Sequence, residues 1–389
     1  MRLSRAGDGP IHLGYCTNVH PAEDVAGIVD QLRRLAAGVR AELTWPRLGV
    51  GLWLPRTAAT ELADPAACAR LREVLDELGL EVVTLNGFPY QGFQEEVVKH
   101  RVYRPDWTED ARVTWTLDLA RILARLLPDD VATGSISTLP LGWREPWDDA
   151  ADVAAIANLR AVGDALAALE EETGKRILLA IEPEPGCRVE TTAEAAAVAE
   201  RVGRPHVGIC VDLCHLAVEF EDPVAAIAAL QERGTLVAKV QVSSALRAED
   251  PDDPAVRAAL AGFDEARFLH QTRAGGDGGI RARADDLGEA LAGAVPVDAE
   301  WRVHFHAPLQ AAALPPLGTT RSELETALQQ LVGPGRVLTR HLELETYTWT
   351  VLPPDRRPAG DDSLVSALAE ELRYVAGRLR SLGWTKEEE

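Results

Sequence analysis

The chain has 389 residues, of which 61 are acidic and 40 are basic, so its formal net charge at pH 7 is −21. This balance argues against a nucleic-acid-binding surface and against adsorption to anionic membranes, because both need clustered positive charge. No apolar run approaches the roughly 20 residues that span a bilayer, so no membrane insertion is expected. The five cysteines are widely spaced and form no CxxC pair, which predicts a reducing, cytoplasmic location.

Apolar, β-branched runs alternate along the chain with longer segments rich in Ala, Leu, Glu and Arg. In chain order, the eight runs that predict strands cover residues 11–16, 49–55, 81–88, 130–140, 176–186, 206–215, 236–244 and 337–349. Helices are predicted between them, over about 22–43, from Asp64-Pro65 onward, over about 109–127 and 149–173, after Thr191 or Thr192, and over about 362–382. Alternation of this kind is typical of a parallel sheet covered by helices.

The number of strands, and the spread of polar residues over many strand ends, predict a single α/β domain spanning residues 1–389. We expect a (β/α)8 TIM barrel rather than an open doubly wound sheet. No GxGxxG motif follows a predicted strand, and no GxxxxGK[ST] motif occurs. Residues 245–336 are predicted to form a long insertion between strands seven and eight, at the barrel mouth. It contains a Gly-rich segment at 274–279, expected to be a flexible loop, and a strand-like run at 301–309.

Polar side chains stand where the later predicted strands end. Glu182 ends an apolar run in strand five, Asp212 ends strand six, and Gln241 lies in strand seven. Strand eight carries Glu343 and Glu345 on one face, and alternation along the strand does not choose between them. Three carboxylates and an amide from neighbouring strands predict a divalent metal site for Mn, Mg, Zn or Co. Taken alone, Glu343 is better explained as an ion-pair partner.

Two histidines in the insertion extend this metal hypothesis. His304 and His306 are two residues apart in an extended run, so their side chains share a face and can converge on one ion. Together with His215, which follows strand six, they predict a second metal position richer in nitrogen. A lone histidine is more often a packed or surface residue, and for His270 and His20 both interpretations stay open.

The remaining polar and aromatic residues near the strand ends suggest a ligand. Amides, hydroxyl groups and aromatic rings together suit a small polyhydroxylated molecule, and the alternative is that the rings only seal the barrel mouth. Gln241 is a poor metal ligand, and its alternative role is a hydrogen bond to substrate. The predicted substrate-binding residues are Asn86, Tyr90, Ser135, Gln241 and Trp349.

The segment GICVDLCH resembles the Asp-x-x-His strand of the xylose-isomerase-like superfamily, which includes sugar isomerases, sugar epimerases and endonuclease IV-type enzymes. That resemblance implies a divalent metal held by Glu182, Asp212, a residue of strand seven and one of the two strand-eight glutamates. It also implies that His215 contacts substrate or a second metal. The superfamily generally has a metal-binding histidine where this chain has Gln241, and this departure weakens the transfer of isomerase chemistry.

A longer set of segments is similar to the EboE family of metabolite traffic proteins. Each segment is weak alone, but the set is specific because it runs in order over nearly the whole chain. The resemblance implies a role in the maturation or traffic of a small secondary metabolite. The segments are YCTNVHP, TLNGFPY, VVKHRVYRPDW, GSISTLPLGW, EPEPGC, DLCH, KVQVSSAL, FLHQ, WRVHFHAPL and ELETYTWTVLP.

Three functions compete at this point. The first is a metal-dependent isomerase or epimerase in which Glu182 or Glu345 moves a proton and His215 assists. The second is a carrier that binds a metabolite without turning it over, which the glutamine at position 241 favours. The third is an endonuclease IV-like phosphodiesterase, against which the net charge of −21 counts. We expect a small-molecule partner and no nucleic acid.

Overall fold

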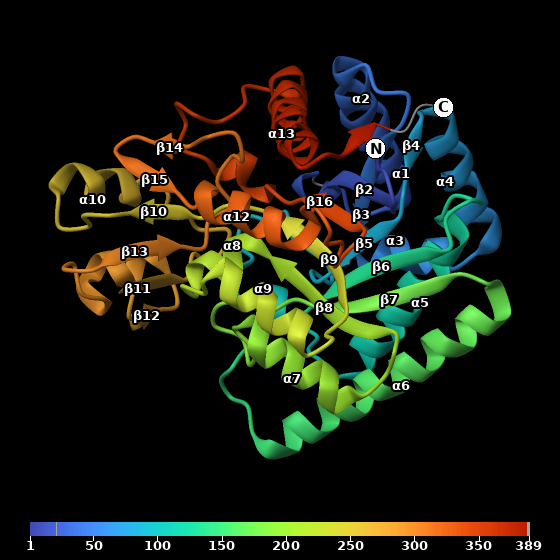
Figure 1. Cartoon of the computed structure of the whole chain (residues 1–389), viewed down its shortest axis with the longest axis horizontal. Helices are drawn as coiled ribbons and strands as arrows, with labels where there is room; N and C mark the ends of the chain where they lie inside the picture. Colours follow the sequence, from blue (N-terminus) through green and yellow to red (C-terminus); the bar gives the residue numbers. More distant parts are fainter. Residues whose placement is uncertain (21, 387–389) are drawn as a thin grey trace.

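The computed structural model describes residues 1–20 and 22–386, and its centre is a closed parallel barrel surrounded by helices (Figure 1). Each barrel strand pairs in parallel with the next, and β2 pairs with both β16 and β3, which closes the ring. The predicted (β/α)8 TIM barrel is therefore confirmed. In chain order, the barrel strands are β2 (Asp8–Cys16), β3 (Leu48–Trp53), β5 (Thr84–Gly87), β6 (Thr133–Thr138), β7 (Arg176–Ile181), β8 (Val207–Asp212), β9 (Val237–Val242) and β16 (His341–Leu344).

Alternation along β7 shows how the barrel is filled. Ile177, Leu179 and Ile181 belong to the main core, whereas Ala180 belongs to a small separate cluster with Cys210 of β8. Strands buried on both faces are nearly continuous apolar runs, as parallel sheets require. Except for β2, which begins earlier than predicted, the observed strands are shorter than predicted, so that Glu182 and Glu345 stand just beyond strand ends and Asp212 stands at one.

Helices cover the outside of the barrel. Asp64 caps its helix and Pro65 occupies the first turn, as predicted. Of the two candidate caps before the next such helix, Thr191 is the one used, and it forms a capping box with Glu194. The longer helices are α1 (Val25–Gln31), α2 (Ala37–Leu43), α3 (Arg56–Leu62), α4 (Pro65–Glu77), α5 (Asp110–Leu126), α6 (Asp149–Thr173), α7 (Thr192–Val202), α9 (Pro223–Glu232), α12 (Arg321–Val332) and α13 (Asp361–Ser381).

The segment between β9 and β16 forms a second, antiparallel sheet beside the barrel (Figure 1). Its strands are β10 (Leu246–Ala248), β11 (Thr272–Gly276), β12 (Gly279–Ala284), β13 (Glu300–Val303), β14 (Ala313–Leu314) and β15 (Leu317–Thr319), with α10 (Pro254–Ala261) between β10 and β11. The prediction of a flexible loop at 274–279 was wrong: these residues make the β11–β12 hairpin, where glycines allow close strand approach. The last part of the predicted insertion, α12, packs against α9 as a barrel helix.

Two short strands add to the barrel sheet at its edge. β1 (Arg2–Arg5) pairs antiparallel with β2, and β17 (Thr385–Lys386) pairs with β1. Neither strand was predicted, because both runs are too short and too polar to show a period. They bring the two ends of the described chain side by side, away from the carboxyl ends of the barrel strands.

Candidate metal centre

Three carboxylates from different strands meet at the carboxyl end of the barrel. Glu182 follows β7, Asp212 ends β8 and Glu345 follows β16. Each offers an oxygen within 4.8 Å of the others, and all three side chains belong to residues no more than 5% exposed. The structure thus brings together the residues that the strand-end pattern grouped.

Neighbouring side chains fix one oxygen of two of these groups. Asp212 Oδ1 caps the short helix α8 (Leu213–Val218) by accepting a hydrogen bond from the His215 amide at 2.8 Å. The same oxygen accepts a bond from Ser243 Oγ at 2.8 Å. Glu345 Oε1 accepts bonds from the side-chain amides of Asn18 and Asn86, at 2.7 and 2.8 Å. These contacts orient the carboxylates without neutralising them.

The electrostatics of the cluster are unfavourable for the protein alone. Burial, and then the charge of Asp212, raise the pKa of Glu182 to about 8. Burial, and then Glu182 and Asp212, raise the pKa of Glu345 well above its ordinary value. Like charges held close together in a buried site disfavour ionisation, and a cation between them removes that penalty.

Three histidines lie against the cluster. His306 Nδ1 donates to the Glu345 carbonyl at 2.6 Å, which directs Nε2 elsewhere. His215 Nδ1 donates to the Pro183 carbonyl at 2.8 Å, and its Nε2 faces His304 Nε2 at 3.0 Å. Ligand atoms of Asp212, His215 and His306 lie within 4.8 Å of one another. His304 belongs to a different group, with Cys214 and His306, so the three histidines predicted for a second position are divided between two groups of the described residues.

The hydrogen-bond state of this region tests whether it fits a metal. Among the residues described, the side-chain atoms here that are buried without a hydrogen-bond partner include Glu182 Oε2, Asp212 Oδ2, Gln241 Oε1, Gln241 Nε2 and His306 Nε2. Buried polar atoms are normally satisfied, so a group of unsatisfied atoms, most of them acceptors, indicates a site for a cationic ligand. Carboxylate and amide oxygens with an imidazole nitrogen are the donors that Mn, Mg, Zn or Co accept, and the residues fit such an ion.

The two glutamates of strand eight have different environments. Glu343 forms an ion pair with Lys239, and both side chains are fully buried. Its carboxylate fills the space beside Gly51, where an added Cβ would lie 1.2 Å from Glu343 Oε1. Glu343 is therefore held inside the barrel by the positive charge of Lys239. Glu345 is the strand-eight glutamate that joins the cluster.

A cavity opens above the carboxylates. Glu184 lines it and accepts a hydrogen bond from Tyr103 Oη at 2.6 Å. Burial raises the pKa of Glu184 to about 6. The cavity wall includes Asn18, Asn86, Phe88, Phe93, Lys99, Tyr103, Glu182, Glu184, His215, Phe268, His304, His306, Glu345 and Tyr347.

Several predicted residues lie away from this cavity. The Ser135 hydroxyl is buried inside the barrel, within hydrogen-bonding distance of Thr84 and His341. Tyr90 packs edge-on against Trp115, and Trp349 donates to Glu371 at 3.1 Å. Of the substrate-binding residues predicted, Asn86 is the one found in the cavity wall, whereas Gln241 lies beside Asp212 inside the barrel.

The two histidines whose roles were left open belong to the packing. His270 is bound by Glu265 at 2.9 Å and by the His304 carbonyl at 2.9 Å. His20 lies beside Tyr15, and neither lines the cavity.

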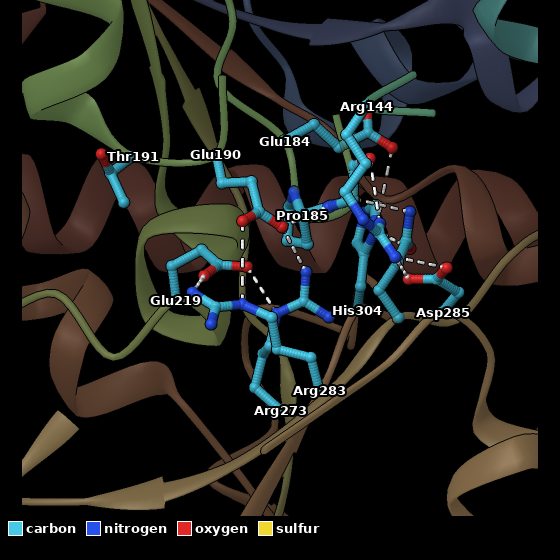
Figure 2. Close-up of polar contacts among 12 residues, drawn as sticks. Arg144, Glu184, Pro185, Glu190, Thr191, Glu219, Arg273, Arg283, Asp285 and His304 are labelled. Carbon is cyan, nitrogen blue, oxygen red and sulfur yellow. Dashed lines mark hydrogen bonds and ion pairs between the residues drawn. The ribbon is translucent and has the colours of Figure 1, made fainter. Parts of the chain in front are cut away.

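Ion pairs attach the second sheet to the barrel near the site, as Figure 2 shows. The buried Arg273 of β11 donates to Glu219, just after α8, and to Glu190, before α7, both at 2.7 Å. Arg144, in the loop after β6, binds both oxygens of Asp285 at 2.6 Å. These contacts hold the insertion, and with it His304, over the strand ends.

Four residues of this region were not picked out from the sequence: Tyr103, Phe93, Phe268 and Gln271. Phe93, Phe268 and Gln271 stand in loops and Tyr103 ends a short 3-10 helix, so no period marks the side that these residues face. Gln271 donates to Tyr103 Oη and to the Pro185 carbonyl, each at 2.8 Å, and its Oε1 lies 2.7 Å from His304 Nδ1. The one available signal was that Tyr103, Phe268 and Gln271 belong to segments that resemble the EboE family; Phe93 lies outside them.

Comparison with known proteins supports the architecture. A D-allulose 3-epimerase from Methylomonas sp. in complex with D-allulose has a TM-score of 0.50 and 13% identity, covering 97% of this chain and 99% of that one. The IOLI protein with a zinc atom has a TM-score of 0.52 and 11% identity, covering 96% and 99%. A D-psicose 3-epimerase determined in the presence of D-fructose has a TM-score of 0.51 and 14% identity, covering 96% and 99%. At these identities the likeness shows the fold alone.

Sequence comparison gives the family. No curated protein matches the chain. In the described part of the chain, no helix is long and apolar enough to cross a membrane. A family model described as "Xylose isomerase-like TIM barrel" matches residues 49–269, which is more than half of the chain. The protein therefore belongs to the xylose isomerase-like TIM barrel family.

Proposed function

We propose that the protein is a metal-dependent isomerase or epimerase that acts on a small polyhydroxylated metabolite. The observation that carries this proposal is the cluster of Glu182, Asp212 and Glu345, whose ligand atoms lie within 4.8 Å of one another at the barrel mouth. Reactive groups of TIM-barrel enzymes stand at this end of the strands. Solved structures with this fold include a D-allulose 3-epimerase, a D-psicose 3-epimerase and the IOLI protein with a zinc atom.

The proposed metal ligands are Glu182, Asp212, Gln241 and Glu345, and a second position would use His304 and His306. A divalent ion bound there would polarise a carbonyl and its neighbouring hydroxyl group. Gln241 can contribute its side-chain oxygen, since both amide atoms lack a partner among the residues described. Among the described residues, none of the three carboxylates is paired with a lysine or arginine, and Asp212 Oδ1 lies 3.8 Å from His215 Nε2.

Proton transfer is assigned to the two glutamates that flank the space above Asp212. A carboxylate acts as general base or acid when it lies within hydrogen-bonding reach of the proton that it moves, and both glutamates line the cavity. Asn18 and Asn86 hold Glu345 in one orientation. His215, oriented by the Pro183 carbonyl, would bind a substrate hydroxyl group.

The test is exchange of substrate protons with solvent. Protein loaded with Mn²⁺, Co²⁺ or Zn²⁺ is incubated in D₂O with ketohexoses and inososes, and deuterium at the carbon next to the carbonyl is followed by NMR. We expect exchange with at least one member of the panel, and at least hundredfold slower exchange in Glu182→Gln and Glu345→Gln. Loaded protein that exchanges no proton and turns over no polyol or ketose contradicts the proposal.

A second candidate is a carrier that binds the same metabolite without turnover. Gln241 favours it, because the superfamily pattern has a histidine there and a weaker metal site suits binding better than catalysis. Stoichiometric ligand binding without exchange would support the carrier. The net charge of −21 makes nucleic acid an unfavourable partner, so we place the endonuclease-like alternative last.

At a finer level, we propose that the chain is an EboE-type metabolite traffic protein. The support is the ordered set of sequence segments from YCTNVHP to ELETYTWTVLP. Several of them supply the cavity wall, including the segments with Tyr103, Phe268 and His306. We also propose a cytoplasmic location, and the five free, buried cysteines agree with a reducing compartment.

A further inference from the structure

The cavity above the carboxylates has two chemically different halves. Its inner half is lined by Glu182 and His306, and Glu182 Oε2 and His306 Nε2 are buried acceptors without a hydrogen-bond partner among the described residues. Its outer half is walled by apolar side chains from three separate segments of the chain. These are Phe88, Pro89, Phe93, Val98, Val102, Phe268, Leu269 and Tyr347.

Three of the outer rings form a mutually packed group. The ring centroids lie 5.0 Å apart for Phe93 and Phe268, 5.2 Å for Phe93 and Tyr347, and 4.9 Å for Phe268 and Tyr347. Tyr347 also packs on His306, with centroids 4.7 Å apart, so the aromatic wall continues to the inner half without a break. An apolar group attached to a bound oxygen-rich head would reach these rings directly.

The polar groups of the outer half are already used within the protein. Lys99 Nζ binds Asp286 at 2.5 Å and the Glu265 carbonyl at 3.2 Å. Tyr103 Oη donates to Glu184 and accepts from Gln271. Hydroxyl groups placed there would lose hydration without gaining protein partners, which is unfavourable. A free sugar carries such hydroxyl groups on every carbon, so this half suits it poorly.

We propose that the natural substrate is a bipartite molecule: a head with adjacent oxygens, such as an α-hydroxyketone, carried on an apolar body that lies against Phe93, Phe268 and Tyr347. This inference rests on the proposed function, because it takes the head to bind at the carboxylate cluster. It narrows the polyhydroxylated metabolite of the proposed function to a molecule whose hydroxyl groups are confined to the head. The body is aromatic or similarly flat, because the wall that receives it is made of rings.

Calorimetric titration of the Mn²⁺-loaded protein tests the proposal with matched probes. Hydroxyacetone carries the head alone, 1-hydroxy-3-phenylpropan-2-one carries the same head on a phenyl group, and D-fructose is hydroxylated throughout. We expect the phenyl probe to bind at least about tenfold more tightly than either of the others, from burial of one ring. Phe268→Ala should reduce this preference at least about threefold.

The control is Phe220→Ala, which removes a partly exposed ring outside the cavity and should leave the preference intact. Phe268→Leu keeps an apolar wall and should retain most of the preference, and thermal melting shows that each variant is folded. Equal binding of hydroxyacetone and the phenyl probe, or tighter binding of D-fructose, overturns the bipartite substrate and leaves the proposed function standing. If none of the three probes binds, both proposals fall.

Discussion

Two layers of the barrel interior differ in whether a buried carboxylate has a positively charged partner. In the lower layer, Glu343 is paired with Lys239, and both side chains are fully buried. In the upper layer, Glu345 joins Glu182 and Asp212, and no lysine or arginine in the described part of the chain is bonded to any of the three. Glu343 and Glu345 are only two residues apart on one strand. Where the chain supplies the countercharge the carboxylate is structural, and where it does not, the carboxylate is available for a ligand.

The largest expected effect comes from breaking the lower pair. Lys239→Met leaves Glu343 buried without a partner and should lower the free energy of unfolding by about 3–5 kcal/mol. Denaturant titration measures the change. Combining it with Glu343→Met removes both charges and should recover most of the loss. A double variant as unstable as the single one would show that packing, not charge, is what the pair contributes.

Glu371 shows a further environment for a buried carboxylate, in which neutral hydrogen-bond donors are its partners. Glu371 of α13 accepts bonds from the Leu309 amide, Thr346 and Trp349, and burial raises its pKa from 4.5 to about 7. The folded state therefore binds the proton more tightly than the unfolded chain. The stabilisation is complete below about pH 4.5 and disappears as the pH rises to about 7.

We expect Glu371 to account for a fall of up to about 3 kcal/mol in the free energy of unfolding across that window. Denaturant titrations at several pH values should show a flatter profile in Glu371→Gln. Glu370→Gln, an exposed neighbour on the same helix, is the control and should keep the wild-type slope. An unchanged slope in Glu371→Gln would mean that another group titrates.

The upper layer is tested by its metal content. Protein purified without chelator should carry close to one divalent ion per chain, and Asp212→Asn should weaken metal binding about a hundredfold. Asparagine keeps an acceptor for the α8 cap, so the loss is not a helix effect. Elemental analysis measures the content. Asp222→Asn, which changes the exposed cap of α9, should retain the ion.

Wild-type protein that is empty and cannot be loaded would contradict the metal centre. The barrel would then be better described as a metabolite-binding protein. Full metal occupancy in both Asp212→Asn and Asp222→Asn would show that Asp212 is not a metal ligand. Either result, this one or an empty wild type, would contradict the idea that the upper-layer carboxylates serve a metal while the lower-layer carboxylate is structural.

The sequence was enough for the barrel and for most of the carboxylate cluster. Strand order follows from apolar runs that alternate with helical segments, and Glu182 and Asp212 each end such a run. The alternation of side chains along a strand tells which face of the sheet a residue is on, but not how far along the barrel axis it lies. For this reason Ser135, on the inward face, was expected at the cavity and lies below it, and Glu343 could not be told from Glu345.

The conformation of the loops also could not be predicted from the sequence. Phe93 and Phe268 come from connections that are shaped by tertiary contacts, such as the bonds from the Val98 and Lys99 amides to the Arg267 carbonyl at 2.8 Å. No local pattern records such contacts. Of the second sheet, only the strand-like run at 301–309 was predicted, and β13 (Glu300–Val303) begins it. The other strands were missed because they are short and the Gly-rich hairpin has few apolar side chains.

The smallest expected effect concerns position 241, where the two layers meet. Gln241 lies opposite Asp212 on one side and Glu343 on the other, and neither of its amide atoms has a partner in the described residues. Gln241→His restores the nitrogen ligand of the superfamily pattern and should tighten metal binding about tenfold, measured by competition with a chelator. Gln241→Leu removes both amide atoms at similar size and should weaken metal binding. If histidine and leucine act alike, the residue does not reach the ion, and the site is built from the three carboxylates with His306.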